Sequence, residues 1–230
     1  MRVLVACEES QTVCNAFRKR GHEAYSCDLL DCSGGHPEWH IRQDVLPLIN
    51  GNCTFITRDG KEHTIEGKWD LIVAHPDCIY LCVTGNRWFN KEKYGEKAIE
   101  REKSRKKAIQ FFMKFVHADC DHVAIENPVG VMSTVYRKPN QIIQPYMFGD
   151  PYEKKTCLWT KGLPLLTEMN AVKPPERVRF DSGKSMPEWY AKAWRLPKEE
   201  RSKLRSKTFP GFAEAMAEQW GKYIEEEKHE

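Results

Sequence analysis

The chain has 230 residues, of which 40% are hydrophobic and 11% aromatic, and this composition excludes a mostly disordered protein. A chain of this size buries about 70% of its unfolded surface, so residues 1–230 are expected to form a single domain. The mean hydropathy is −0.65 and no apolar run is long enough to cross a bilayer, so we expect no membrane partner. Nine cysteines and no expected secretion signal indicate reduced thiols in a cytoplasm.

The net charge of +3 is unevenly distributed along the chain. Residues 1–80 hold 8 Lys+Arg and 12 Asp+Glu, whereas residues 81–230 hold 28 and 21. An acidic first third suits a small ligand with hydroxyl and amino groups, and a basic remainder suits a polyanion. An ordinary mixed-charge surface gives the same balance, so charge alone indicates only a direction.

Strands and helices alternate through the first two thirds of the chain. The expected elements are a strand at 2–6, a helix at 11–20, strands at 23–27 and 41–44, a hairpin at 53–66, a strand at 70–74, a helix at 96–117 and strands at 122–125 and 156–160. Ser10 is expected to cap the first helix, and Asp59-Gly60 to turn the hairpin. The alternation predicts an α/β fold with a mostly parallel sheet flanked by helices, where ligands bind at the carboxyl ends of the strands.

The last third is less regular. Residues 162–205 contain five prolines and are expected to form a small loop-rich insertion. The closing helix, from about Gly211, carries Phe212, Met216, Trp220 and Ile224 at helical spacing, which is typical of core packing.

The ends of the predicted strands carry the residues that could do chemistry. Cys78 follows a proline in the loop after strand 70–74, a setting that can expose a thiol. Glu126 ends the next strand, so the two side chains could face each other. A thiolate beside a carboxylic acid forms a nucleophile and acid pair. A buried structural cysteine with an unrelated loop carboxylate is the alternative.

At these residues the chain resembles the cytosine-C5 DNA methyltransferase family, particularly its small phage-type members. The nucleophile motif of that family, a strand followed by Pro-Pro-Cys, resembles residues 70–78, and its Glu-Asn-Val motif resembles Glu126-Asn127-Pro128. Residues 208–217 resemble the closing motif of the family, which returns to the cofactor site. The resemblance implies a Rossmann-like class I methyltransferase fold with residues 162–205 as a reduced target-recognition or substrate-binding region.

The resemblance also implies roles for individual residues. Cys78 is expected to be the covalent nucleophile and Glu126 the acid at N3 of a cytosine flipped out of DNA, with Asn127 beside it. The implied cofactor is S-adenosylmethionine. Its expected contacts are Cys7, Glu8, Asp28, Asp44, His75 and Pro76, with Asp28 toward the ribose, Asp44 toward the adenine and Glu8 toward the methionine amine.

Three positions depart from the family pattern. The first motif, Ala6-Cys7-Glu8-Glu9-Ser10-Gln11, contains no glycine. Asp77 replaces the second proline before Cys78, and a carboxylate there raises a thiol pKa. The paired arginines of the family have Lys154-Lys155 as their nearest counterparts.

Two basic segments could bind nucleic acid. Residues 86–107 hold nine Lys/Arg and four Glu, and residues 162–205 hold ten basic and six acidic residues, each segment with interleaved aromatic residues. The expected nucleic-acid contacts are Arg87, Trp88, Lys91, Lys93, Lys154 and Lys155. The alternative is a solvated helix start, with Trp88 tucked into the core, and a small packed subdomain.

Other functions remain open. Cys27, Cys32, His36 and His40 could form a structural zinc site, but the spacing is unusual and no metal is expected. A catalytically inactive methyltransferase-like protein that binds DNA or another protein is the main rival, and modification at C5 of a free nucleotide or RNA is another. An amino-group methyltransferase would require a Pro-Pro-Tyr/Phe ending at residue 78, and the cysteine there disfavours it.

Overall fold

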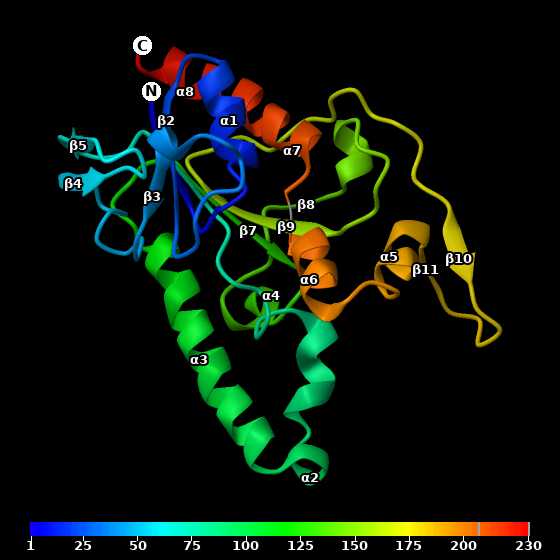
Figure 1. The fold of residues 1–230 in the computed structure, drawn as a ribbon. Coiled ribbons are helices and arrows are strands. Elements are labelled where there is room, and N and C mark those ends of the chain that lie inside the picture. The colour runs from blue at the N-terminus through cyan, green and yellow to red at the C-terminus, as the bar shows by residue number, and fades with distance from the viewer. Residues whose placement is uncertain (207, 230) are drawn as a thin grey trace.

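The computed structural model describes residues 1–206 and 208–229, and in them seven strands build one sheet. These strands are β1 (Arg2–Ala6), β2 (Glu23–Asp28), β3 (His40–Arg42), β6 (Leu71–Ala74), β7 (Val123–Pro128), β8 (Gln141–Ile143) and β9 (Thr156–Lys161). Their order is β3-β2-β1-β6-β7-β9-β8 (Figure 1). The first five pair in parallel, whereas β9 runs antiparallel to both β7 and β8. The predicted mostly parallel α/β sheet is therefore confirmed, and the three-residue strand β8 is too short to show a sequence pattern.

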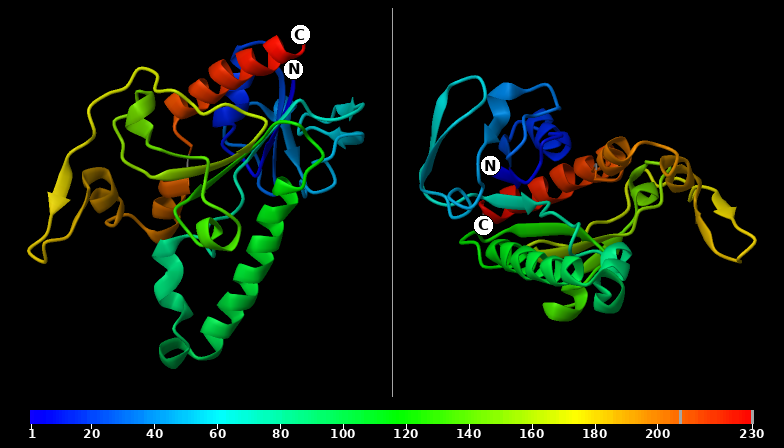
Figure 2. Two further views of the ribbon diagram at one scale, coloured as in Figure 1. Left: turned by 180° about the vertical axis from the view of Figure 1, so that it is seen from behind. Right: turned by 60° about the horizontal axis from the view of Figure 1, so that its bottom comes forward.

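Helices cover both faces of the sheet. Those of the first two thirds are α1 (Thr12–Lys19), η1 (Pro37–Trp39), η2 (Val83–Phe89), α2 (Lys91–Tyr94), α3 (Glu96–Val116), α4 (Met132–Val135) and η3 (Pro145–Phe148). Those of the last third are α5 (Glu188–Ala193), α6 (Lys198–Ser206), α7 (Pro210–Ala215), the π-helical turn η4 (Met216–Trp220) and α8 (Gly221–Glu227). In Figure 2, α3 and the closing helix lie on opposite faces of the sheet.

Each face of the sheet has its own apolar core. On the α3 side, Phe112 is fully buried and meets the ring of Trp159 edge-on at 5.2 Å. On the other side, Phe17 of α1 and Trp220 of the closing helix are both fully buried. Phe212, Met216, Trp220 and Ile224 all belong to this second core, as their spacing predicted. Burial of a large aromatic side chain stabilises the fold by about 1.5–3 kcal/mol.

Two short hairpins complete the fold. β4 (Cys53–Ile56) and β5 (Glu62–Ile65) form the predicted insertion, which turns at Asp59-Gly60. Phe55 of this hairpin packs against Tyr25 with ring centroids 5.0 Å apart, so the insertion shares the first core. The second hairpin, β10 (Arg177–Arg179) and β11 (Ser185–Pro187), lies within the predicted loop-rich segment.

The molecule has two projections. The described structure exposes 12851 Å², more than the roughly 10,800 Å² expected for a compact chain of this mass. Figure 1 shows the cause: α3 extends away from the sheet toward α2, and β10 and β11 reach out on another side. These projections carry the two basic segments that the sequence singled out. No helix in the described part of the chain is long and apolar enough to cross a membrane.

The start of α1 differs from the prediction. Ser10 does not occupy the cap position, because Gln11 does so in a left-handed conformation with φ 58°. The Glu8 carboxylate instead accepts the backbone N–H groups of Val13 at 2.7 Å and Cys14 at 3.2 Å. Unpaired N–H groups and the helix dipole both favour an anion at this position. Glu8, only 4% exposed, therefore caps α1 from outside the usual position.

Removal of this carboxylate tests its structural role. Glu8→Ala leaves two buried N–H groups without their acceptor, so we expect the free energy of unfolding to fall by about 1–2 kcal/mol. Urea denaturation measures the loss. The neighbouring Glu9→Ala variant keeps the Glu9 backbone carbonyl that accepts from Ser33, and it should change stability by less than about 0.5 kcal/mol. Equal losses in the two variants would contradict the capping role.

Candidate active site

One register row aligns the strand ends at the carboxyl edge of the sheet. Ala6 pairs with Cys27 on one side and with Ala74 on the other, and Ala74 pairs with Ile125. The residues that follow these four are Cys7, Asp28, His75 and Glu126. The N–H of Cys7 donates to the carbonyl of Cys27 at 2.7 Å, and the N–H of His75 donates to that of Ala6 at 2.9 Å. The structure therefore brings the sequence-predicted strand-end residues to one edge.

Cys78 lies in the turn that follows β6. The Asp77 carboxylate accepts the N–H of Ile79 at 2.8 Å, and the Cys78 carbonyl accepts the N–H groups of Leu81 and Cys82, each at 3.0 Å. Asp77 thus turns the chain where the resembled family has a second proline. Burial raises the pKa of the Cys78 thiol to about 12, and repulsion from Cys82, Glu126 and Asp77 adds to this effect. Cys78 is therefore a protonated thiol at neutral pH.

Glu126 at the end of β7 has the opposite tendency. Burial opposes its ionisation, but a hydrogen bond from His75 and the positive charge of Lys154 outweigh burial and lower its pKa. The Nδ1 atom of His75 lies 3.1 Å from Oε2 of Glu126, and the two side chains are only 10% and 13% exposed. The resting site therefore pairs a neutral thiol with an ionised carboxylate.

Lys154 and Lys155 lie in different surroundings, although the sequence suggests that they act as a pair. Lys155 is exposed, whereas Lys154 is half-buried and lines a small cavity with Glu126 and Thr156. Phe209 and other residues of the closing motif, Thr208 and Phe212, close the same cavity. The resemblance implied that this motif returns to the cofactor site; its aromatic residues lie beside Glu126.

Asn127 ties the two strand ends together. Its Nδ2 atom donates to the carbonyl of Pro76 at 2.7 Å, and the residue is 1% exposed. This contact joins the end of β7 to the turn that carries Cys78. The Oδ1 atom of Asn127 is buried without a hydrogen-bond partner among the described residues.

The loop after β1 takes its shape without glycine. Cys7 has φ 60° and Gln11 has φ 58°, both in the left-handed region that non-glycine residues seldom adopt. Burial raises the pKa of the Cys7 thiol strongly, and the carboxylates of Asp28, Asp44 and Asp77 add to the effect. These acidic groups therefore gather around the strained turn, and strain of this kind is concentrated at functional sites.

Asp28 and Asp44 share one local geometry. The Asp28 carboxylate accepts the N–H of Leu30 at 2.9 Å, and the Asp44 carboxylate accepts the N–H of Leu46 at 3.0 Å. A carboxylate has about four lone-pair sites, so each keeps acceptor capacity for a ligand hydroxyl or amine.

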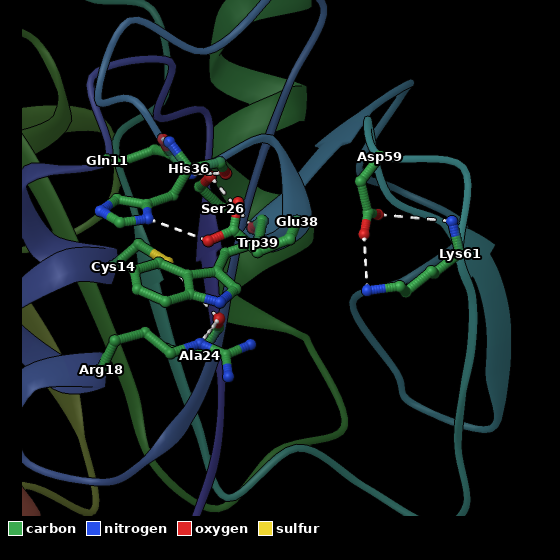
Figure 3. A network of polar contacts seen from close by, with 10 residues as sticks. All are labelled: Gln11, Cys14, Arg18, Ala24, Ser26, His36, Glu38, Trp39, Asp59 and Lys61. Carbon is green, nitrogen blue, oxygen red and sulfur yellow. Dashed lines mark hydrogen bonds and ion pairs between the residues drawn. The ribbon is translucent and has the colours of Figure 1, made fainter.

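A neighbouring segment holds the β1–α1 loop in place (Figure 3). The Gln11 amide donates to the His36 carbonyl at 2.8 Å and accepts the His36 N–H at 3.1 Å. The His36 ring stacks on Trp39 at 3.9 Å, and the Arg18 guanidinium lies 5.0 Å from the Trp39 ring. A Cβ atom on Gly34 would come within 2.5 Å of the Gln11 Cβ atom, so this approach requires glycine.

The histidine and cysteine residues of the zinc alternative serve other contacts. His40 is fully buried, with Nδ1 2.9 Å from the Ser26 hydroxyl and Nε2 2.9 Å from the Leu30 carbonyl. The Cys27 thiol donates to the Gln43 carbonyl at 3.5 Å. Within residues 1–206 and 208–229, no group of three or more His, Cys, Asp or Glu side chains is arranged to hold a metal ion.

The tip of the α2–α3 projection is hollowed into an open cavity of about 710 Å³. We call it the tip cavity; its lining residues are Asn86, Arg87, Trp88, Phe89, Asn90, Lys93 and Tyr94. The rings of Trp88 and Tyr94 lie 5.0 Å apart, and the Arg87 guanidinium lies 4.8 Å from the Trp88 ring. Trp88 is 42% exposed, so the alternative that buried it in the core is wrong.

Two other cations of this segment face inward. Arg101 donates to the Ile79 carbonyl at 2.8 Å, and Arg105 donates to the Tyr80 carbonyl at 2.8 Å. The Arg105 guanidinium also lies 3.5 Å from the centroid of the Phe89 ring. Arg101 and Arg105 therefore hold the loop after Cys78 against α3, while Arg87 and Lys93 line the tip cavity.

Among known proteins, the chain shows similarity to solved structures. No protein-family model and no curated protein sequence matches the chain. Among solved structures, it is similar to an E. coli prophage protein that is described, provisionally, as a DNA modification methyltransferase. The TM-score is 0.42 at 11% identity, and the match covers 86% of this chain and 56% of that protein.

The topology defines the fold class. From β1 the chain proceeds outward to β2 and β3, then returns to the other side of β1 to form β6 and β7, and helices cover both faces. An antiparallel β9 beside β7 completes a Rossmann-like methyltransferase fold. The carboxyl ends of β1 and β6 flank the point where the strand order reverses, which is where such sheets bind ligands.

The opposed tendencies of the thiol and the carboxylate lead to a prediction about reactivity. Glu126→Gln keeps an oxygen that can accept from His75 but removes the charge that raises the pKa of Cys78. Because the thiolate is the nucleophile, we expect iodoacetamide to alkylate Cys78 several-fold faster at pH 8–9 in this variant. Mass spectrometry of the Cys78 peptide gives the rate.

Asp77→Asn is the matched control, because Asn can still accept the Ile79 N–H while it removes a weaker charge. It should accelerate alkylation less than Glu126→Gln does. An unchanged or slower rate in Glu126→Gln would show that the carboxylate does not act on the thiol.

Proposed function

We propose that the chain is an S-adenosylmethionine-dependent methyltransferase that acts on cytosine C5 in DNA through a covalent Cys78 adduct. The observation that carries this proposal is the convergence of Cys78 and Glu126. Cys78 lies in the turn after β6 and Glu126 lies in β7, next to the residue that pairs with Ala74 of β6, and Lys154 acts electrostatically on both. A nucleophile and a proton-carrying group on neighbouring strand ends suit addition to a polarised ring.

The chemistry requires a thiolate at C6 and a proton at N3. The resting site holds the Cys78 thiol and the Glu126 carboxylate instead. Transfer of one proton from Cys78 to Glu126 produces both the thiolate and the carboxylic acid that can protonate N3. The sulfur then bonds to C6, Glu126 protonates N3, and C5 becomes nucleophilic. S-adenosylmethionine would supply the methyl group to C5. A water molecule would then take the C5 proton as the S–C6 bond breaks, which releases the Cys78 thiolate. N3 would return its proton to Glu126, which passes it back to Cys78 and restores the resting site.

The acidic edge near Cys7 fits such a cofactor. Asp28 and Asp44 retain acceptor capacity there for ribose hydroxyls and the adenine amine. Glu8 gives both carboxylate oxygens to α1, so its predicted contact with the methionine amine competes with this capping role. We assign Asp28 and Asp44 to the nucleoside and leave His75 and Pro76 on the side facing the substrate.

The tip cavity supports DNA as the substrate. Its exposed Trp88 ring and half-buried Tyr94 ring suit stacking on bases, and Arg87 and Lys93 suit phosphate contacts. A target base inside a duplex has to be flipped out to reach Cys78, and a second contact region at the tip would hold the deformed strand meanwhile.

The covalent step is tested with DNA that carries 5-fluorocytosine. Because fluorine at C5 cannot leave as a proton, the wild type should form a Cys78 adduct that survives denaturation, detected by gel shift and mass spectrometry. Cys78→Ser should form none and should reduce methyl transfer to background while keeping the melting temperature. Full activity in Cys78→Ser would rule out the proposal.

A binding measurement beside the adduct experiment distinguishes the enzyme from an inactive methyltransferase-like protein. Calorimetry with S-adenosylhomocysteine reports cofactor binding without turnover. Binding together with an adduct supports the enzyme, whereas DNA binding without either supports a methyltransferase fold that has lost its chemistry. An adduct on a free nucleotide or RNA, and none on DNA, would change the substrate.

The tip cavity leads to a prediction about salt dependence. Replacing Arg87, Lys91 and Lys93 by alanine should flatten the plot of log affinity for DNA against log salt by about one unit per lost phosphate contact. Binding to all sequences should weaken alike, because phosphate contacts carry no sequence information. Fluorescence anisotropy at several salt concentrations gives the slope.

Lys106→Ala/Lys107→Ala is the matched control, because both residues are exposed cations on α3 outside the tip cavity. Trp88→Ala should cost about 1–3 kcal/mol of binding at an unchanged melting temperature if the ring stacks on a base. An unaltered slope in the triple variant would remove the tip from the DNA interface.

A further inference from the structure

His75 lies between Cys7 and Glu126 in the row of residues at the carboxyl edge of the sheet. It follows β6, and its backbone N–H donates to Ala6 of β1. The resemblance implied that His75 contacts the cofactor. In the structure its Nδ1 atom lies 3.1 Å from Oε2 of Glu126. With only 10% and 13% of the two side chains exposed, water competes little for this contact.

The proton of this hydrogen bond lies on Nδ1. Glu126 is ionised, so it can only accept. The Nε2 atom of His75 is buried and has no hydrogen-bond partner among the described residues. The hydrogen of the contact therefore belongs to the Nδ1 atom of His75, which donates it to the Glu126 carboxylate.

Charged groups from two further elements act on this pair. Glu8 of the β1–α1 loop interacts electrostatically with His75, and Lys154 before β9 interacts with Glu126. Glu126 in turn acts on the thiols of Cys78 and Cys157. Thr156 adds a hydrogen bond to the Glu126 carboxylate. Among these groups, His75 is the one that lies between β6 and Cys78 and contacts the Glu126 carboxylate.

We infer that His75 is a positioning residue: its Nδ1–H fixes one oxygen of Glu126 and leaves the other oxygen to exchange the proton between Cys78 and the substrate. The inference rests on the proposed function for its last step, but the contact itself exists without substrate. His75 acts through Glu126 and does not bind the reacting ring.

The consequence is a specific dependence of Glu126 on the chemistry at position 75. Without the Nδ1–H donor, burial of the carboxylate is opposed only by Lys154 and Thr156, so the pKa of Glu126 should rise. Asparagine can place an amide N–H close to the position of Nδ1, whereas glutamine places its amide nearer to Nε2. The two variants have similar polarity and differ mainly in where the donor lies.

The experiment is a pH titration of the Glu126 side-chain carboxyl carbon by NMR on the full chain, assigned by the loss of its signal in Glu126→Gln. We expect a midpoint below the ordinary value of about 4.3 in the wild type and in His75→Asn. His75→Gln and His75→Phe should raise the midpoint by about one unit or more, a tenfold change in proton affinity. Melting temperatures confirm that each variant is folded, and His75→Gln carries the test if His75→Phe does not fold.

The acid limb of 5-fluorocytosine adduct formation should move with the midpoint in the same variants. A midpoint that is equal in the wild type and His75→Gln, or raised equally in His75→Asn and His75→Gln, would overturn the positioning role. If the midpoints behave as expected and no adduct forms on DNA, the positioning contact stands and the proposed reaction fails.

Discussion

The register between β1, β6 and β7 is the constraint on which the site depends. Ala6, Ala74 and Ile125 sit side by side, so the next residue of each strand reaches the same edge at the same height. A slip of one residue in either pairing would send His75 or Glu126 to the opposite face of the sheet. The two apolar cores prevent such a slip, because it would move buried side chains such as Val73 and Ala124 out of their core. The core packing that stabilises the fold therefore also fixes the geometry of the site.

Of the two neighbouring acidic groups, the Cys78 thiol rather than the Glu126 carboxyl carries the proton. Burial alone favours the protonated form of both Cys78 and Glu126. Lys154 lowers the pKa of both groups, but burial dominates at Cys78, whereas His75 and Lys154 together outweigh burial at Glu126, so the thiol retains the proton. This distribution protects the thiol from oxidation, because the thiolate is the reactive species.

The basic projection illustrates how one residue type serves two purposes. Arg101 and Arg105 bind backbone carbonyls of the Cys78 loop and stiffen it against α3. Arg87 and Lys93 stand over aromatic rings at the tip instead. The inward arginines of α3 therefore hold the segment between Cys78 and the tip cavity in place.

The sequence by itself determined the elements and the candidates. Alternating apolar strands and helices predicted the mostly parallel sheet, and the residues after each strand identified Cys78, Glu126 and Asp28, because period and strand position are local properties. It could not determine which polar groups meet. That Glu8 caps α1, that His75 contacts Glu126 and that Lys154 and Lys155 part ways depend on residues 5 to 51 positions apart or on which way a side chain turns. Arg105 and Arg87 look alike in the sequence, but the packing of the loop against α3 leaves Arg105 half-buried on the Tyr80 carbonyl and Arg87 exposed. Tertiary structure decided these points, because hydrogen bonds and pKa values depend on distance and burial in space rather than on residue type.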